Sequence, residues 1–312
     1  MNDKKLVMCG CHEAGWDIIR FLLKNGIKFS YFVTITEEKA LQQKVSGYKS
    51  FYNLAQEYRI PVYYAKKYSL KSDEDLRFFS ENKFDLLVQG GWQRLFPEDI
   101  LKTLKIGAIG GHGSADFLPM GRGRSPLNWS LIEGQQRIIM QYFLIKPGVD
   151  DGDIFHYDFF DINEWDDIQT LYYKISLLTG RVLLQWIPRL LAGNFSTIPQ
   201  HGKPSYYPKR NPEDGMINWM QSPTQVYNFI RALTRPYPGA FSFINNKKLM
   251  IWKGHPFDSK IDDPSWQIGE IVKIFSSGDF VVKCKGGLFI VTDYEMEDKA
   301  LLKEGLLFDA TG

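Results

Sequence analysis

The chain has 312 residues, more than one typical domain needs, and this length predicts two domains. Its 38 Lys and Arg nearly balance its 36 Asp and Glu, which excludes a general electrostatic attraction to nucleic acid or to a membrane surface. Three cysteines without a CxxC motif, together with the lack of a signal peptide or a membrane-spanning run, predict a protein of the reducing cytoplasm.

The N-terminal part predicts an open α/β sheet. Residues 5–9 form a short apolar run typical of a buried strand, and residues 16–24 have the apolar spacing of a helix that ends at Gly26. Further strands are expected at 29–35, 61–64, 84–88, 106–109, 138–145 and 154–162, and further helices at 46–59, at 73–82, from 127 and at 165–191. This alternation predicts a Rossmann-like, doubly wound and mostly parallel sheet.

His12 lies in the turn between the first predicted strand and the first predicted helix. The glycines of this turn, Gly10 and Gly15, do not complete a GxGxxG motif, so they indicate a dinucleotide site only weakly. His12 can begin the helix, or it can border a substrate site, because loops at the carboxyl ends of parallel strands line such sites. Both interpretations stay open.

A second loop of interest follows the strand at 84–88. It contains Trp92, Gln93, Leu95 and Phe96, and the apolar members suit contact with a flat heterocycle. Side chains of this kind serve equally well in a hydrophobic core, so the residue types alone do not decide between the two.

The stretch 105–129 carries the strongest chemical signal. A short apolar run leads into glycines that surround His112, and a turn with Arg122 and Arg124 follows. Histidine suits proton transfer because its pKa ordinarily lies near neutrality. Paired guanidinium groups favour an anionic ligand such as a phosphate or a carboxylate. A structural loop with solvated arginines is the alternative interpretation.

This stretch resembles the signature of the folate-dependent formyltransferases, which reads Asn-x-His, then Leu-Pro, then Arg-Gly-x-x-Pro. His112, Leu118-Pro119 and the run 122–126 fit that pattern. A second family signature, Gly-x-Asp-x-Gly-Asp, is matched at residues 148–153. Two unlinked motifs in the right order make the resemblance specific, and it extends through most of the chain.

The resemblance implies roles for individual residues. His112 and Asp150 would carry the acid/base chemistry, with Asp150 orienting the imidazole, favouring its charged form or holding a water. The folate would contact Trp92, Gln93, Leu95, Phe96, Val149, Asp150 and Asp153, and the second substrate His12, Ser114, Arg122, Arg124 and Asn128. For Asp153, a structural role in the turn through backbone N–H groups is the alternative. No second histidine or cysteine lies at ligand spacing from His112, so no metal is expected.

Two departures from the family pattern concern the site. The family asparagine, whose amide helps to hold the formyl oxygen, falls at Gly110, and the loop between His112 and Pro119 is about two residues longer than usual. Losing one oxyanion donor can cost about 10²–10³ in rate where nothing replaces it. Backbone N–H groups of the loop, or side chains of Ser114, Asn128 or Gln93, are the candidate replacements. A weakened or altered activity is the alternative.

The C-terminal part predicts a smaller, β-rich domain. Residues 193–209 have the composition of a linker, and a helix is expected at 223–233. Short strands are expected at 241–244, 248–252, 269–275, 280–283 and 287–292, a spacing typical of a small barrel. Residues 208–210 and 231–240 resemble the OB-like second domain of formyltransferases. We therefore expect a catalytic domain at 1–203 and an OB-like domain at 204–312, with Tyr237, Phe241 and Phe243 allowing a homodimer.

The acceptor of the formyl group is inferred from a missing basic insertion and from the resemblance of the second domain. Formyltransferases that act on initiator tRNA carry a basic insertion after the second strand, but residues 42–49 have no such run. The second domain looks closest to enzymes that formylate nucleotide-linked amino sugars for cell-surface polysaccharides, such as lipopolysaccharide O-antigen. Arg122, Arg124 and Arg210 are then candidates to hold the diphosphate. The expected reaction is formyl transfer from 10-formyltetrahydrofolate to such a sugar. The alternatives are methionyl-tRNA formyltransferase and a folate-binding module that has lost catalysis.

Overall fold

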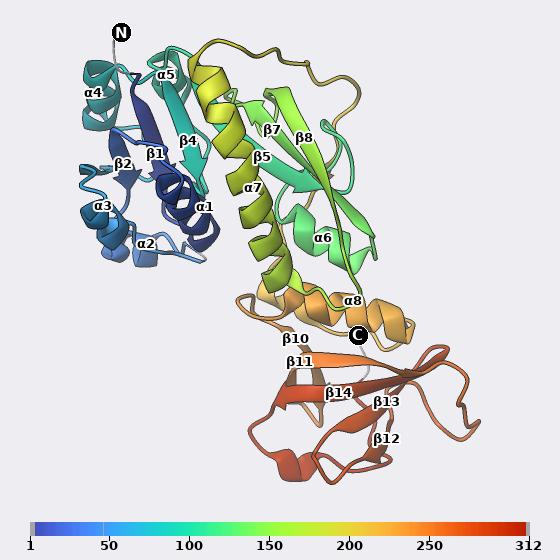
Figure 1. Cartoon of the computed structure of the whole chain (residues 1–312). Helices are drawn as coiled ribbons and strands as arrows, with labels where there is room; N and C mark the ends of the chain where they lie inside the picture. Colours follow the sequence, from blue (N-terminus) through green and yellow to red (C-terminus); the bar gives the residue numbers. More distant parts are fainter. Residues whose placement is uncertain (1–3, 46, 310–312) are drawn as a thin grey trace. The chain divides into compact units, whose positions relative to one another are not determined.

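The computed structural model describes residues 4–45 and 47–309, and by packing the chain divides into two compact units (Figure 1). Unit 1 comprises residues 1–123, 139–160 and 172–206, and unit 2 comprises residues 124–138, 161–171 and 207–312. The chain therefore enters unit 2 several times. The sequence boundary at residue 203 stays a prediction.

Unit 1 is built on one large sheet. Within the described residues it has seven strands in the order β3-β2-β1-β4-β5-β7-β8. The strands are β1 Leu6–Gly10, β2 Tyr31–Thr34, β3 Val62–Tyr64, β4 Leu86–Gly90, β5 Gly107–Ser114, β7 Arg137–Leu144 and β8 Asp153–Asp161. The first five run parallel, and β7 runs antiparallel to β5. The predicted doubly wound, mostly parallel sheet is confirmed.

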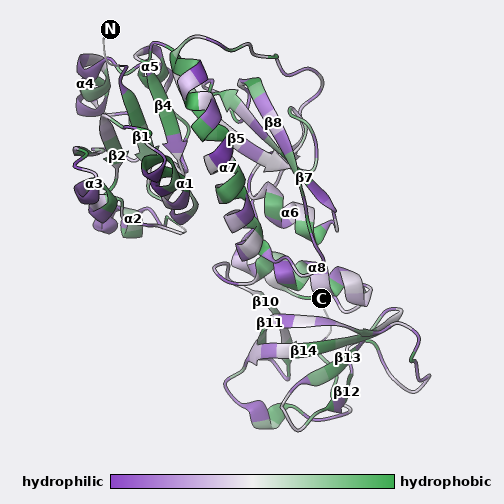
Figure 2. Ribbon diagram, in the orientation of Figure 1, coloured by the Kyte–Doolittle hydropathy of each residue, from purple (hydrophilic) through white to green (hydrophobic). Residues whose placement is uncertain are grey.

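Helices cover both faces of this sheet because its central strands are apolar on both sides. In β1, Leu6 and Met8 belong to one hydrophobic cluster and Val7 and Cys9 to the other, as the alternation of side chains along a strand requires. The covering helices are α1 Glu13–Lys24, α2 Glu37–Gln42, α3 Tyr52–Glu57, α4 Asp73–Asn82, α5 Glu98–Lys102 and α7 Ile168–Leu191. Helices α1 and α7 pack into the first cluster, and α4 and α5 into the second. Figure 2 shows β1 and β4 coloured hydrophobic along most of their length.

Several helix and strand boundaries in the structure differ from those predicted from the sequence. The helix expected at 46–59 is only α3, and Ser46 lies outside the described residues. The larger difference is in β5, which was expected to end at residue 109 and instead continues through the glycines to Ser114. Its extension pairs with β7, from Ile109 opposite Leu144 to Ser114 opposite Ile139. Cross-strand pairing therefore overrides the loop-forming tendency of glycine, and His112 lies within a strand.

Unit 2 combines helices with an antiparallel sheet. Helix α6 (Pro126–Ile132) contacts α8 (Pro223–Leu233), and a 3₁₀ turn, η1 (Pro212–Gly215), precedes α8. Its sheet has the order β10-β11-β14-β13-β12. The strands are β10 Ala240–Ile244, β11 Lys247–Asp258, β12 Ile271–Ile274, β13 Phe280–Cys284 and β14 Gly287–Glu295, and η2 Lys299–Leu301 follows. The predicted β-rich domain is confirmed as an antiparallel sheet.

One part of the proposed dimer surface is wrong. Phe241 is buried, with the Lys248 ammonium 3.9 Å from its ring centroid, so it is not an exposed aromatic side chain. Tyr237 and Phe243 are half-buried.

Glycines let α1 approach the centre of the unit 1 sheet closely. An added Cβ at Gly15 of α1 would lie 1.9 Å from the carbonyl oxygen of Gly90 in β4. At Gly10 of β1, which is paired with Gly90, an added Cβ would lie 2.2 Å from the same atom. Strand β1 neighbours both β2 and β4, so the order of strands reverses at this point of the sheet. Open α/β sheets bind ligands at the carboxyl ends of the strands beside such a reversal.

We expect Gly15→Ala to destabilise the protein by about 3 kcal/mol or more, because the backbone of β4 cannot yield to the added methyl group. Urea unfolding would measure the change. The control is Glu13→Ala on the same helix, which removes an exposed carboxylate and should cost less than about 0.5 kcal/mol. Equal stabilities of the two variants would contradict the predicted close approach.

Candidate functional site

His112 lies near the carboxyl end of β5 and is only 6% exposed. Its Nε2 lies 2.7 Å from the carbonyl oxygen of Gly121, and its Nδ1 lies 3.4 Å from Oδ2 of Asp150. A carbonyl oxygen can only accept a hydrogen bond, so Nε2 must carry a proton. In the neutral ring Nδ1 is then the nitrogen with the free lone pair, and it faces a carboxylate. This arrangement can accept a proton at Nδ1 and stabilise the resulting imidazolium.

Asp150 occupies a tight turn between β7 and β8. Its φ of +49° is a left-handed conformation, which costs a non-glycine residue about 1 kcal/mol or more. Two groups hold the residue there. The side-chain amide of Gln200 donates to the carbonyl oxygens of Asp150 and Gly152, both at 2.8 Å, and the Gly123 N–H points at Oδ2 from 3.4 Å.

The remaining residues of the second motif differ in their surroundings. Asp153 pairs with Lys146 at 2.7 Å, which is a structural use of its carboxylate, although through an ammonium group and not through backbone N–H groups. Val149 is exposed. Asp151 has one buried carboxylate oxygen, Oδ1, that has no hydrogen-bond partner within the described residues.

The place of the family asparagine is filled by apolar side chains. A Cβ at Gly110 would lie 2.8 Å from the ring of Phe143, which is directly opposite on β7, and 2.8 Å from Cγ1 of Ile145. Phe143 is buried. The missing asparagine is therefore accompanied by a repacked neighbourhood, which a single substitution at Gly110 would overfill.

Two of the predicted replacement donors already have partners. The Ser114 hydroxyl donates to the Asp116 carbonyl oxygen at 2.7 Å, and the Asn128 amide, in unit 2, donates to the Ala232 carbonyl oxygen at 2.7 Å. Both side chains are buried. Their hydrogen bonds stabilise the local structure.

The longer loop after His112 is fastened by a residue that sequence reasoning missed. Gln141, fully buried and opposite His112 on β7, accepts from the Leu118 N–H and donates to the Asp116 carbonyl oxygen. Gln200 was missed as well. Neither glutamine belongs to a recognisable motif, so the sequence carried no signal for either.

Some side chains of the loop after β4 pack in the hydrophobic core, and others line a pocket. Trp92 is 2% exposed and packs against Tyr68 and Phe96, so its side chain belongs to the hydrophobic core. The backbone N–H of Gln93 donates to the Tyr68 hydroxyl at 3.1 Å. Leu95, by contrast, is 55% exposed.

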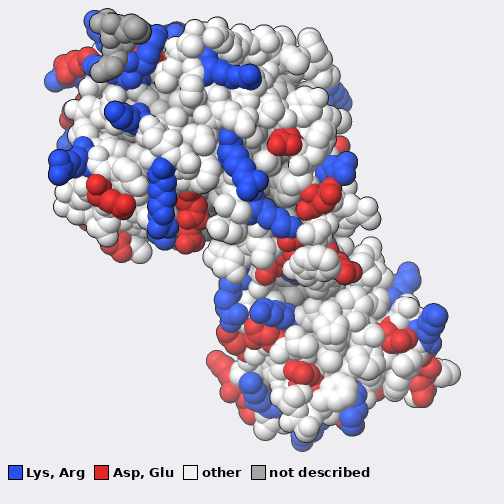
Figure 3. Space-filling view, in the orientation of Figure 1, with Lys and Arg blue, Asp and Glu red and all other residues white. Residues whose placement is uncertain are grey.

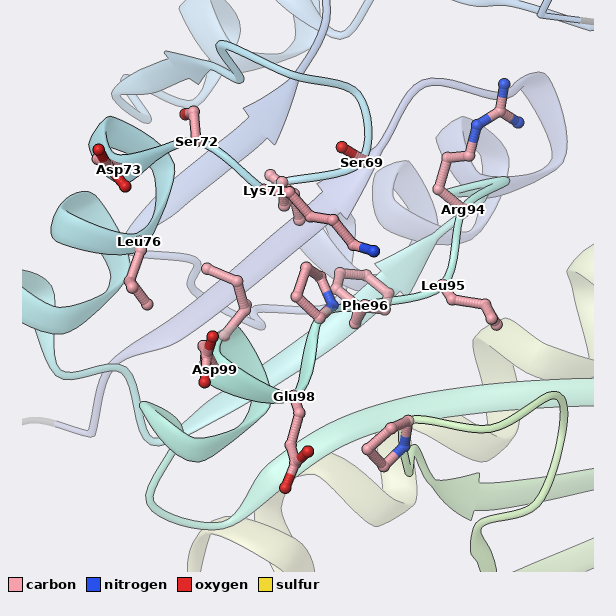
Figure 4. Close-up of a pocket in the computed structure, with 14 residues that line it drawn as sticks. Ser69, Lys71, Ser72, Asp73, Leu76, Arg94, Leu95, Phe96, Glu98 and Asp99 are labelled. Carbon is pink, nitrogen blue, oxygen red and sulfur yellow. The ribbon is translucent and has the colours of Figure 1, made fainter.

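Leu95 and Phe96 line a pocket of about 720 Å³ in unit 1. Its wall also includes Pro147, which directly precedes the second motif. Figure 4 shows the Lys71 side chain extending toward Phe96, while the guanidinium of Arg94 points away from the pocket. The pocket thus brings together the loop after β4 and the start of the Asp150 turn.

His12 is the N-cap of α1. Its Nδ1 accepts from the Ala14 N–H at 3.1 Å, and burial lowers the pKa of the imidazole, which keeps the ring neutral and able to accept this hydrogen bond. The predicted helix-start role fits this geometry. The loop position at the carboxyl end of β1 is also as expected.

The three candidate phosphate-binding arginines differ in exposure and in their hydrogen-bond partners. Arg122 donates to Gln200 Oε1 at 2.5 Å, and its buried Nε has no partner within the described residues. Arg124 is exposed. Arg210, in unit 2, packs against Trp129 and Phe229 and donates to the Asp214 carbonyl oxygen, and burial lowers the pKa of its guanidinium.

The described residues contain neither a cluster of metal ligands nor a membrane-spanning helix. Within residues 4–45 and 47–309, no group of three His, Cys, Asp or Glu side chains could hold a metal ion. In the same part of the chain, no helix combines the length and apolar character needed to cross a membrane.

Comparison with known proteins identifies the family of this chain. The profile of the family described as "Formyl transferase" matches residues 5–187, and that described as "Formyl transferase, C-terminal domain" matches residues 209–306. The bifunctional polymyxin resistance protein ArnA of Wigglesworthia glossinidia brevipalpis is 32% identical over 282 residues, which are 90% of this chain and 41% of that protein. The chain therefore spans less than half of that relative.

Two further likenesses cover nearly complete proteins. The methionyl-tRNA formyltransferase of Bacillus velezensis is 24% identical over 96% of this chain and 92% of its own. The N-formyltransferase of Helicobacter canadensis, solved with folinic acid and dTDP-3-aminofucose, has the same fold with a TM-score of 0.67 at 16% identity, covering 94% of this chain and 100% of that one. The first profile alone covers more than half of the sequence, and the chain belongs to the formyl transferase family, whose members are folate-dependent enzymes.

Proposed function

We propose that this enzyme transfers the formyl group of 10-formyltetrahydrofolate to the amino group of a nucleotide-linked amino sugar, with His112 and Asp150 handling the proton. The observation that carries the proposal is the buried imidazole of His112, which has a carbonyl at one nitrogen and a carboxylate at the other. The folate supplies the formyl carbon when it is bound. The chain's own residues must remove a proton from the amine.

His112 suits this task in its neutral form. Its Nδ1 lone pair is the free basic site, and the proton that it accepts would be shared with the Asp150 carboxylate 3.4 Å away. Gly121 fixes the ring by accepting from the opposite nitrogen. The same ring, once protonated, can return the proton to the departing folate nitrogen.

The pocket beside Leu95 supports a folate site. Folates carry a flat heterocycle, and the exposed Leu95 side chain with Phe96 and Pro147 offers an apolar surface for one. The loop after β4, which the resemblance connects with folate, lines this pocket together with Pro147, which directly precedes the second motif. We therefore place the folate along Leu95.

The stabilisation of the formyl oxygen differs from the family pattern. Gly110 has no side chain, the Ser114 hydroxyl donates to the Asp116 carbonyl oxygen, and the Asn128 amide donates to the Ala232 carbonyl oxygen. The backbone N–H groups of the loop and the Gln93 side chain are the candidate donors, and a lowered rate is the alternative.

An amino sugar fits the surface better than a tRNA does. In the described part of 42–49, Lys49 turns back to pair with Glu13 at 3.6 Å and lies 4.7 Å from the Trp16 ring centroid, so it does not extend as a basic arm. Figure 3 shows Lys and Arg together with Asp and Glu on the visible face of each unit. The likeness to the B. velezensis enzyme keeps methionyl-tRNA as the second candidate.

The purified protein should formylate at least one member of a panel of dTDP-, UDP- and GDP-linked amino sugars when it is given 10-formyltetrahydrofolate. Mass spectrometry would detect the gain of one formyl group. His112→Asn and Asp150→Asn should each lower the rate by about 10²–10⁴, because the amine proton loses its acceptor or the stabilising charge. Formylation of charged initiator tRNA, with no sugar product, would favour the second candidate. Folate binding without any product would indicate a catalytically silent module.

Leu95→Ala should weaken the binding of folinic acid about 10-fold or more, because burying a leucine side chain contributes roughly 1.5–3 kcal/mol. Calorimetric titration measures this directly and requires no acceptor. The matched control is Leu41→Ala on α2, where the side chain is 75% exposed and lies outside the pocket. Equal dissociation constants for the two variants would place the folate elsewhere.

Gly110→Asn alone should destabilise the protein by about 1–3 kcal/mol, because the new side chain would overlap Phe143 and Ile145. In a Phe143→Ala background the cost should shrink, and a double-mutant cycle should give a coupling of roughly 0.5–3 kcal/mol. The rate of formyl transfer is then informative only in the double variant. Additive effects on stability would show that Phe143 does not occupy the space of the missing asparagine side chain.

A further inference from the structure

The segment 198–205 has the composition of a linker, yet it is tied to both loops that flank His112. It belongs to unit 1 and follows α7 as a trace without helix or regular strand (Figure 1). At its start Ile198 exchanges two backbone hydrogen bonds with Ile154 of β8, at 2.9 and 2.8 Å. Two of its later side chains, those of Gln200 and Ser205, then reach the groups that contact the imidazole.

Gln200 holds the turn that carries the Asp150 carboxylate, which faces Nδ1 of His112. Its Nε2 donates to the carbonyl oxygens of Asp150 and Gly152, and its Oε1 accepts from Nη2 of Arg122. Both protons of the amide and its oxygen are used. The two donated bonds hold the left-handed turn that aims the Asp150 carboxylate at Nδ1 of His112.

Ser205 holds the loop that carries the Gly121 carbonyl, which faces Nε2 of His112. Its hydroxyl accepts from the Gly121 N–H at 2.9 Å, its carbonyl oxygen accepts from the Arg122 N–H at 3.0 Å, and its N–H donates to the Pro119 carbonyl oxygen at 3.3 Å. Gly121 has a φ of +69°. Three hydrogen bonds from one residue therefore hold the turn at 119–122, whose Gly121 carbonyl accepts from Nε2 of His112.

We propose that residues 198–205 form a positioning strap for the reacting histidine, with Gln200 and Ser205 as its positioning residues. The proposal rests on the proposed function in so far as His112 and Asp150 handle the proton. Neither residue touches the reacting atoms in this geometry; each holds a group that His112 contacts. The strap thereby sets both the orientation of the imidazole and the nitrogen that stays free.

Catalytic geometry is more sensitive to such a strap than stability is. Ser205 is exposed and Gln200 is only half-buried, so trimming either side chain leaves the hydrophobic clusters untouched. A displacement of about 1 Å at a reacting group can cost on the order of 10²-fold in rate. The two variants should therefore fold normally and react slowly.

The kinetic test compares Gln200→Ala, Gln200→Glu, Ser205→Ala and Ser205→Thr with the control His201→Ala. His201 is an exposed neighbour that takes no part in these hydrogen bonds. Both alanine variants should lower kcat by about 10–100-fold while KM for the folate changes less than about 3-fold. Ser205→Thr keeps the hydroxyl and should restore the rate. Gln200→Glu should not, because a carboxylate cannot donate to the Asp150 and Gly152 carbonyl oxygens.

A second measurement needs no acceptor. The chain has five histidines, so ¹⁵N-histidine spectra of the folate-free protein are simple to assign with His112→Asn. Recorded over roughly pH 5 to 8, they should show the neutral His112 ring protonated at Nε2 in the wild type and in His201→Ala. In Ser205→Ala the Nδ1-protonated tautomer should gain population, and in Gln200→Ala the His112 ring resonances should move from their wild-type positions at a fixed pH.

These readouts separate the strap from the proposed function. If no acceptor is formylated but the His112 spectra respond in both alanine variants, the proposed function fails and the strap stands. If the wild type is active but both alanine variants keep its kcat and its His112 spectra, the strap is overturned and the proposed function stands. Equal melting temperatures across the set would exclude unfolding as the cause of a loss.

Discussion

A neutral imidazole has one donor and one acceptor, and in this protein both nitrogens of His112 have a facing group. The Gly121 carbonyl takes the hydrogen bond of Nε2, and the Asp150 carboxylate faces Nδ1. Because a carbonyl cannot donate, this pairing selects one tautomer and leaves one lone pair for chemistry. The turn at Asp150, the loop at Gly121 and the segment that holds them all converge on this ring.

The repacked position at Gly110 shows how a family site can change without losing its fold. A glycine in β5 admits the Phe143 ring from β7, and the two are directly opposed in the antiparallel pair. The exchange adds apolar contact at the place where the family has a hydrogen-bond donor. If the enzyme keeps its rate, the formyl oxygen must be held by a group other than the one at residue 110.

Sequence reasoning reached the main elements for sound physical reasons. Central strands that are apolar on both faces read as short continuous runs, and the helices at 73–82 and 223–233 begin with clear capping residues and were placed with the bounds that the structure has. It ended β5 too early because glycines read as a loop when their pairing partner is unknown. It also offered Trp92 as a contact surface, whereas the tight packing against Tyr68 makes that side chain part of the core.

What the sequence determined by itself was the alternation of strands and helices and the two motifs that carry His112 and Asp150, because both are local patterns. Only the tertiary structure decided which groups surround the imidazole. Ser205 and Gly121 are 84 residues apart in the sequence, and Gln200 and Asp150 are 50 residues apart. Sequence spacing therefore does not predict their hydrogen bonds. Polar side chains in irregular segments follow no period, and their partners are set by how the backbone carbonyls of distant turns happen to point once the sheet has formed.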